Sequence, residues 1–191
     1  MARPKEFDVD VALMNAMVLF WEKGYENTSL QDLVSRMGVH KRSMYDTFGD
    51  KRTLFLRALN RYADLTEAAD RERVAEAGNA LEALRVLFES SVEQSDARPS
   101  GCLVVNSATE VALRDPEATA RVERNFAEQQ RLLKEIVERG QRDGDIDRCH
   151  DAGVLATTLF NALLGLRVQA RVVTDRALLA RMVEGVLAAV R

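Results

Sequence analysis

Apolar residues recur at helical spacing along almost the whole chain, and turn residues divide them into about nine segments. Val9, Leu13, Met17 and Phe20 follow the three- and four-residue steps of one helical face, which predicts a first helix. No segment shows the strict alternation of apolar and polar residues that marks a half-buried strand. The pattern therefore predicts an all-α protein.

Two short amphipathic segments meet at Gly38. Leu33 and Met37 lie on the apolar stripe before the glycine, and Met44 and Phe48, four residues apart, resume the stripe after it. A glycine between two such stripes predicts a tight corner. Two helices joined in this way have the layout of a helix-turn-helix DNA reader.

The start of the first of these helices has two candidate caps. Ser29 and Asp32 have the spacing of a capping box, in which two side chains accept the free N–H groups of the first turn. Thr28 with Gln31 offers the same device one residue earlier. The predicted start is therefore uncertain by one residue.

The second helix of the pair opens with a cationic patch. His40, Lys41, Arg42 and Ser43 occupy its first turn, where side chains and backbone N–H groups can face a phosphate or a base edge. Arginine can donate two parallel hydrogen bonds to guanine, so Arg42 is the expected base reader. The alternative is a merely solvated charged face, with Tyr45 as a half-buried core ring. The helix-turn-helix context favours DNA contact.

The run from residue 7 to about 62 resembles the DNA-binding domain of the TetR family of transcriptional regulators. The matching features are a helix ending in Gly-Tyr at 24–25, a Thr-capped second helix, a Gly-Val turn at 38–39, and a Tyr-x-x-Phe-x-x-Lys segment over 45–51. Arg42 departs from the small residue or proline common in the family. Asp46 is an acid where many members carry a neutral or basic side chain, and it could accept from cytosine or repel phosphate. The resemblance implies that the DNA contacts are Thr28, Lys41, Arg42, Ser43, Tyr45, Thr47 and Lys51.

The rest of the chain predicts a second helical unit. We expect residues 1–50 to form the DNA-binding domain and residues 51–191 a ligand-binding and dimerisation domain, joined by a long helix over about 50–77 with Asp50 as its N-cap. Further helices are expected at about 79–95, 101–114 and 117–139. A surface loop is expected over 140–150, which is rich in Asp and Gly.

Two apolar helices are predicted at the carboxyl end, and the segment 154–168 is apolar nearly all round. Such a helix needs cover on more than one face, from a deep monomer core or from a partner. Because about nine helices share 191 residues, the interior is limited and a two-fold four-helix interface is expected. The resemblance also implies a homodimer, whose paired readers could address a palindromic operator. The candidate interface residues are Leu155, Leu159, Leu163, Leu166, Leu179, Met182, Val186 and Val190.

Apolar side chains of the central helices are candidates for an effector pocket, although plain core packing is the simpler interpretation of each. The resemblance implies a small-molecule effector that releases the operator. Cys102 follows Gly101 at a predicted helix start, where the helix dipole stabilises a thiolate. Residues 99–106 resemble a subgroup of TetR-type regulators with Gly-Cys at this helix start, some of which sense oxidants or electrophiles; an inert buried cysteine is the alternative. The pocket candidates are Phe88, Cys102, Val105, Phe126, Leu133, Phe160 and Leu164.

Charge and composition limit the kinds of binding partner that this protein can have. The net charge is −3, yet residues 1–62 hold 10 Lys and Arg against 8 Asp and Glu, so the positive charge is local to the reader. No run approaches 18 apolar residues and the first ten residues lack a signal-peptide core, so we expect a cytoplasmic protein with no membrane partner.

Catalysis has little support in the sequence. The only histidines, His40 and His150, accompany no nucleophile motif, and no phosphate loop or metal-ligand spacing is present, so we expect no enzyme activity, cofactor or metal. The predicted function is a sequence-specific transcriptional regulator, most simply a repressor released by an effector or by thiol modification. The alternatives are a sequence-independent DNA-binding protein, against which the net charge counts, and a helical binding protein or enzyme with a non-functional reader.

Overall fold

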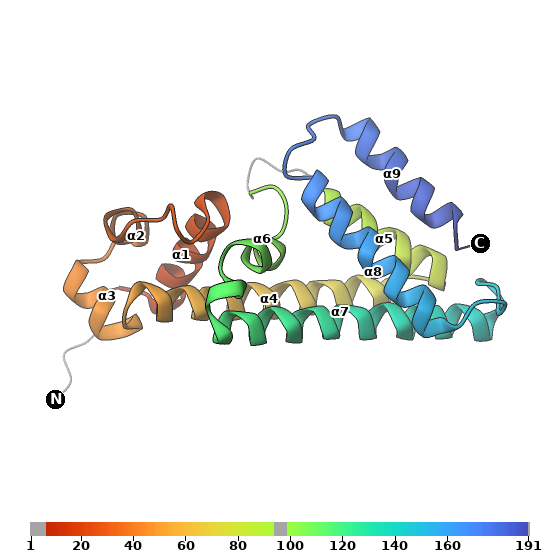
Figure 1. Cartoon of the computed structure of the whole chain (residues 1–191), viewed down its shortest axis with the longest axis horizontal. Coiled ribbons are helices and arrows are strands. Elements are labelled where there is room, and N and C mark those ends of the chain that lie inside the picture. Colours follow the sequence, from red (N-terminus) through yellow and green to blue (C-terminus); the bar gives the residue numbers. More distant parts are fainter. Residues whose placement is uncertain (1–6, 94–98, 191) are drawn as a thin grey trace.

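The computed structural model describes residues 7–93 and 99–190, which contain nine α-helices, one 3₁₀ turn (η1) and no strand (Figure 1). The all-α prediction is confirmed. The elements are α1 Val9–Lys23, α2 Leu30–Met37, α3 Lys41–Phe48, α4 Lys51–Glu76, α5 Ala80–Val92, α6 Leu103–Glu110, η1 Ala112–Arg114, α7 Pro116–Asp143, α8 Ala152–Gln169 and α9 Arg176–Ala188.

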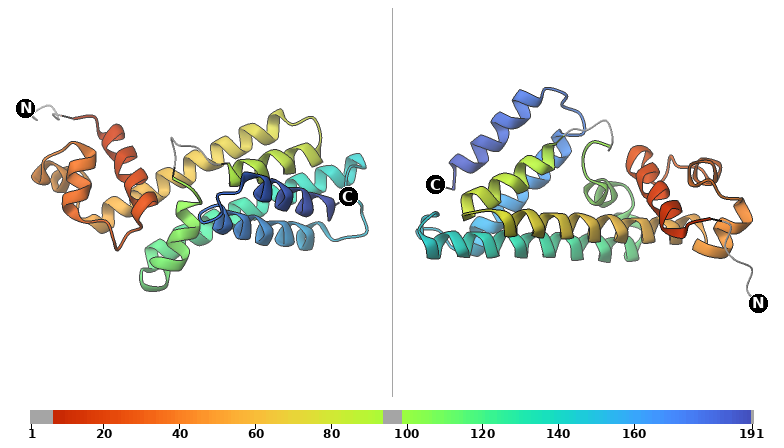
Figure 2. Two further views of the ribbon diagram at one scale, coloured as in Figure 1. Left: turned by 90° about the horizontal axis from the view of Figure 1, so that it is seen from above. Right: turned by 180° about the vertical axis from the view of Figure 1, so that it is seen from behind.

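The molecule is elongated, with α1, α2 and α3 gathered at one end (Figures 1 and 2). The two longest helices, α4 and α7, run side by side along its length, and α5, α8 and α9 pack at the other end. The short α6 lies between the two groups and contacts α1, α4, α7 and α8. The long α4 therefore connects the group of α1, α2 and α3 directly to the second group of helices, as the sequence predicts.

Caps set the ends of the helices in the reader. Ser29 accepts from the Asp32 N–H at 3.0 Å while the Asp32 carboxylate accepts from the Ser29 N–H, so the later of the two possible capping boxes forms. Gly38 ends α2 in the left-handed region, at φ 66°, which glycine adopts without steric cost. Asp50 caps α4 by accepting from the Thr53 N–H at 2.7 Å, as predicted.

Two apolar clusters hold the fold together. The first joins α1, α2, α3 and the beginning of α4 to α6 and the start of α7, and it includes the fully buried Phe20, Phe48 and Phe55. The second joins α5, α7, α8 and α9. α6 therefore shares one apolar core with the helices of the reader.

The predicted loop over 140–150 begins later than expected. α7 continues through Asp143 and ends at Gly144, which is left-handed at φ 88°. Gly140 lies inside the helix, where an added Cβ would be 2.7 Å from atoms of both Ala80 and Ile146. The glycine therefore marks a close approach of neighbouring side chains and not a helix end. The helix predicted over 101–114 is also divided, into α6 and η1.

Candidate functional site

The exposed face of α3 is the cationic surface of the reader. Lys41 and Tyr45 are exposed and the Arg42 side chain is 93% exposed, whereas Met44 and Phe48 on the opposite face are buried. His40 at the N-cap makes no side-chain hydrogen bond to the helix, so no side chain occupies the first backbone N–H groups. The first turn thus offers cationic side chains and free amides in one direction, which suits an anionic backbone.

Arg42 has one charged neighbour on its own helix. Its Nε lies 3.7 Å from Asp46 Oδ2, and both side chains are largely exposed. An exposed pair of this kind is worth little in water, so it does not hold Arg42 away from another partner. Asp46 still lowers the local positive charge of the patch.

The other predicted DNA contacts are less exposed. Ser43, Thr47 and Lys51 are half-buried, and the Lys51 Nζ lies 4.4 Å from the centre of the Tyr25 ring. Thr28 is completely buried, and its hydroxyl donates to the Gly24 carbonyl at 2.6 Å. Thr28 therefore secures the corner between α1 and α2 and presents no free hydroxyl to a duplex in this conformation.

A carboxylate from α6 holds the same corner. Glu110 accepts from the backbone N–H of Tyr25 at 3.1 Å and from that of Glu26 at 2.9 Å. Gly24 allows this approach, because its φ is 82° and an added Cβ would lie 2.8 Å from a Glu110 oxygen. Glu110, the last residue of α6, therefore binds the turn that precedes α2, the first helix of the helix-turn-helix pair.

A second ionic contact joins the start of α4 to the start of α7. Arg52 donates from Nε and Nη2 to the two Asp115 oxygens at 2.6 and 2.9 Å, and it also pairs with Glu117. Asp115 in addition caps α7 by accepting from the N–H groups of Glu117 and Ala118. The Arg52 guanidinium holds the pKa of Asp115 below its usual value. Arg52, the neighbour of the predicted DNA contact Lys51, therefore faces the second helical unit.

Family comparisons agree with this architecture. Residues 13–58 match the family of bacterial regulatory proteins of the tetR type, and residues 80–186 match the Tetracyclin repressor-like C-terminal domain. The chain belongs to the TetR family. It is 36% identical over 178 residues to the uncharacterized HTH-type transcriptional regulator YezE of Bacillus subtilis, covering 92% of each chain. It is 31% identical over 172 residues to the HTH-type transcriptional repressor ComR of Escherichia coli, covering 88% of this chain and 82% of that one.

A solved relative places the same fold on DNA. A cysteine-substituted variant of the TetR family regulator CifR, complexed with 26-base-pair operator DNA, superposes with a TM-score of 0.87 at 35% identity and full coverage of both chains. The reduced form of Escherichia coli NemR, at 20% identity and a TM-score of 0.83, shares the fold. The prediction of a DNA-binding transcriptional regulator is confirmed.

The candidate dimer residues face inward within this TetR-family chain. Leu155, Leu159, Leu163, Leu166, Leu179 and Val190 are buried and Met182 and Val186 half-buried, because α8 and α9 turn these side chains toward each other and toward α5 and α7. The outward face of α8 instead carries Val154 and Val168, 66% and 54% exposed. Gly165 on α8 and Gly185 on α9 have open space where a Cβ would stand. By length and composition α8 also suits a membrane span, but its leucines are used in this core.

One of the seven predicted effector-pocket residues, Cys102, lines a cavity among the described residues. This cavity of about 360 Å³ lies among α1, α4, α5 and α8, beside the start of α6, and the other six candidates are not among its lining residues. Phe88, Val105, Leu133 and Phe160 are buried in the two clusters, and Phe126 and Leu164 pack between those clusters. The central aromatic rings fill the interior by packing on each other, as Phe126 does on Phe160 at 5.3 Å.

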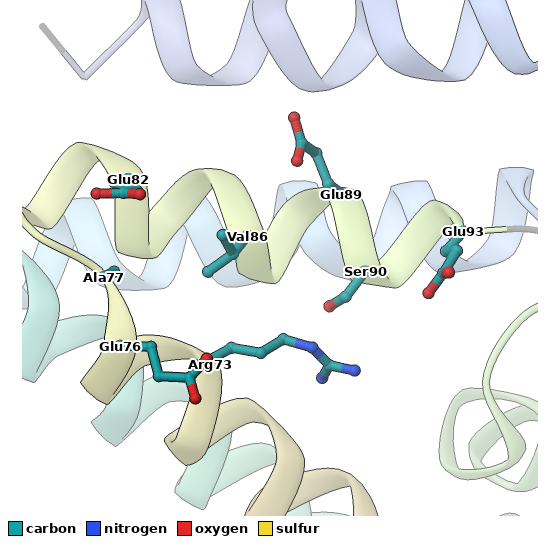
Figure 3. A pocket seen from close by; sticks show the side chains of 8 residues that line it. All are labelled: Arg73, Glu76, Ala77, Glu82, Val86, Glu89, Ser90 and Glu93. Carbon is teal, nitrogen blue, oxygen red and sulfur yellow. The ribbon is translucent and has the colours of Figure 1, made fainter.

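A second, larger hollow of about 500 Å³ lies between the end of α4 and α5 (Figure 3). Its side chains include Glu76, Glu82, Glu89 and Glu93, with Arg73 reaching in from α4. Such an acidic lining does not suit an apolar effector.

Cys102 lies at the start of α6 and is only 4% exposed. Its thiol and the Leu103 N–H both interact with the Tyr62 hydroxyl. The pKa of Tyr62 is raised well above its usual value, mainly because Tyr62 is buried and also because Cys102 lies beside its hydroxyl. A reagent would therefore have to enter the cavity to reach this thiol. Met17, from the apolar face of α1, and Trp21 also line that cavity.

Proposed function

We propose that this protein is a cytoplasmic, non-enzymatic TetR-family repressor whose dimer binds a palindromic operator and is released by an effector or by modification of Cys102. In this proposal residues 1–50 bind DNA and residues 51–191 bind the effector and the partner. The observation that carries it is the exposed cationic first turn of α3, set on a buried Met44 and Phe48.

The predicted contact residues of α3 and the start of α4 lie along one side of the proposed complex. Arg42 reads a base, and Lys41 and Ser43 contact phosphate close to the free amides of the first turn. Tyr45 donates its hydroxyl to the duplex backbone, and Thr47 lies one turn behind Ser43. Lys51 reaches phosphate after leaving the Tyr25 ring, whose attraction for an ammonium at a part-exposed site is modest.

The proposed dimer contact uses the outward faces of α8 and α9. Small residues at Gly165 and Gly185 allow the partner's helices to approach closely, and Val154 and Val168 supply apolar area. The predicted interface leucines lie on the opposite, buried faces of α8 and α9 and hold these two helices in place. A pair related by two-fold symmetry would hold two α3 helices for two half-sites.

Release is proposed to pass through α6. One end of this helix, at Cys102, forms part of the cavity wall, and the other end, at Glu110, holds the Tyr25–Glu26 turn of the reader. An effector or a modified thiol that shifts α6 would therefore move the Tyr25–Glu26 turn, and with it the position of α2 and α3. The effector must prefer the released state by a few kcal/mol, because equal affinity for both states shifts nothing.

Selection of bound fragments from random DNA tests this function. The proposal predicts enrichment of a palindromic sequence, whereas a sequence-independent binder would retain all fragments alike. Absence of any enrichment refutes it. The thiol route is tested separately: if Cys102→Ser leaves operator release by hydrogen peroxide unchanged, Cys102 is not the switch.

A further inference from the structure

The carboxyl end of α3 has no cation of its own. Its last turn carries Asp46 and no Lys or Arg. The last carbonyls of a helix lack partners within it and carry partial negative charge, so a nearby cation stabilises them and an acid does not. The Tyr45 carbonyl accepts from the Gly49 N–H, but the residue that would donate to the Thr47 carbonyl, Lys51, already begins α4. This end of α3 therefore needs a donor from elsewhere.

Arg57, an exposed residue of α4, supplies both the donor and the cation. Its Nη1 donates to the Thr47 carbonyl at 3.0 Å. Its guanidinium carbon lies over the Phe48 ring, 4.9 Å from the ring centre. One side chain thus contacts the backbone of Thr47 and the ring of Phe48, which are the last two residues of α3.

Phe48 is also one of the two side chains that attach α3 to the core. Of the eight residues of α3, only Met44 and Phe48 are buried. Phe48 is 1% exposed, and besides Arg57 it has the ring of Phe7 near it, with centroids 6.3 Å apart. A guanidinium over the face of an aromatic ring attracts it and shields it from water. Because so few side chains anchor this short helix, the contact with Arg57 is a substantial part of what fixes its orientation.

We propose that Arg57 is a positioning residue for base reading: it fixes the carboxyl end of α3 without touching DNA, so that Arg42 meets its base at one angle. The inference rests on the proposed function, since it concerns how α3 reads the operator. Base-edge hydrogen bonds carry the sequence information and need a fixed helix, whereas phosphate contacts carry none. Loss of Arg57 should therefore weaken binding to the operator more than binding to random DNA.

Arg57→Ala and Arg61→Ala make a matched pair of variants. Each removes one cation from an exposed position of α4, one turn apart, so each changes the general attraction for DNA to a similar extent. The probes are the operator fragment selected from random DNA and a random fragment of the same length. Arg57→Ala should lower the ratio of the two affinities about fivefold, the lower end of what one hydrogen bond and one exposed cation–π contact contribute. Arg61→Ala should keep the natural ratio, and Arg57→Lys, which retains a cation and a donor, should recover most of it.

Two further readouts separate positioning from other roles of Arg57. Positioning predicts that Arg57→Ala and Arg61→Ala share one slope of log operator affinity against log salt. It also predicts faster amide hydrogen exchange over residues 44–49 in Arg57→Ala alone. A slope smaller by about one in Arg57→Ala, with equal losses on both DNAs, would make Arg57 a phosphate contact and overturn the inference.

A purely structural role would also overturn it. In that case Arg57→Ala would unfold at lower urea but keep the natural ratio of operator to random affinity. The failure of this inference is distinct from failure of the proposed function. If the natural protein selects no operator, the proposed function fails; if it selects one and Arg57→Ala discriminates as well as Arg61→Ala, only the role of Arg57 is refuted.

Discussion

Glu110 is expected to hold the reader in place, and its removal should uncouple the reader from the rest of the chain. Its carboxylate accepts from two backbone N–H groups, at 3.1 and 2.9 Å, across more than 80 residues of sequence. A hydrogen bond to a charged group contributes about 1.5–3 kcal/mol, and the bond to the exposed Glu26 N–H lies at or below the lower end. Glu110→Ala should therefore cost about 2–3 kcal/mol. Glu110→Gln keeps one acceptor oxygen and should cost about half as much.

Urea unfolding followed by two probes checks this expectation. Far-UV circular dichroism follows all helices, whereas the fluorescence of Trp21 follows α1 and the first apolar cluster. The two transitions should coincide in the natural protein, because one core joins α6 to the reader. In Glu110→Ala the fluorescence transition should move to lower urea than the dichroism transition. Operator affinity should fall about tenfold, since the reader is no longer held at one angle to the dimerisation helices.

Glu138→Ala is the matched control for this change. Glu138 makes one exposed pair with Lys134 on α7, at 3.6 Å, so its removal should cost less than about 0.5 kcal/mol. If Glu110→Ala and Glu138→Ala behave alike, with coincident transitions in both, the Glu110 contact does not hold the reader. That result would refute the proposed release of DNA through α6.

Four further outcomes are expected. Arg42→Ala should relax discrimination at one base position, measured by binding to single-base operator variants; equal losses on all sequences would remove it as a base reader. Lys51→Ala should weaken all DNAs alike and reduce the slope of log affinity against log salt by about one, and an unchanged slope would argue against phosphate contact. Asp115 has a lowered pKa, so its charge stabilises the fold above its unfolded pKa of about 3.9 and loses this effect as pH falls through the folded value. Asp115→Asn keeps the cap and loses the charge, so its stability deficit in urea unfolding should vanish under acid conditions; a deficit independent of pH would contradict this. Val168→Glu should shift the protein toward monomer in sedimentation, and an intact dimer would place the interface elsewhere.

Local features of the reader were predictable from sequence because short-range rules determine them. The capping pair Ser29–Asp32, the left-handed Gly38 and the Asp50 cap each depend on residues within a few positions. The cationic face of α3 follows in the same way from the apolar spacing of Met44 and Phe48.

Contacts between distant segments could not be predicted in this way. Nothing local in Glu110 or Asp115 indicates that one accepts from the α1–α2 turn and the other from Arg52. Apolar periodicity identifies the buried face of α8 but does not say whether its own chain or a partner covers that face. For this reason the leucines assigned to the dimer lie in the monomer core, and the outward positions such as Gly165 are the ones left open.

The central claim is that two copies of this chain present their α3 helices to a single duplex. Footprinting of the selected operator, combined with sedimentation of the complex, measures this directly. We predict two protomers per duplex and two protected major-groove segments about 34 to 36 Å apart, or a multiple of that repeat, placed symmetrically about the palindrome centre. One protomer per duplex, or uniform protection of any DNA, would contradict the account.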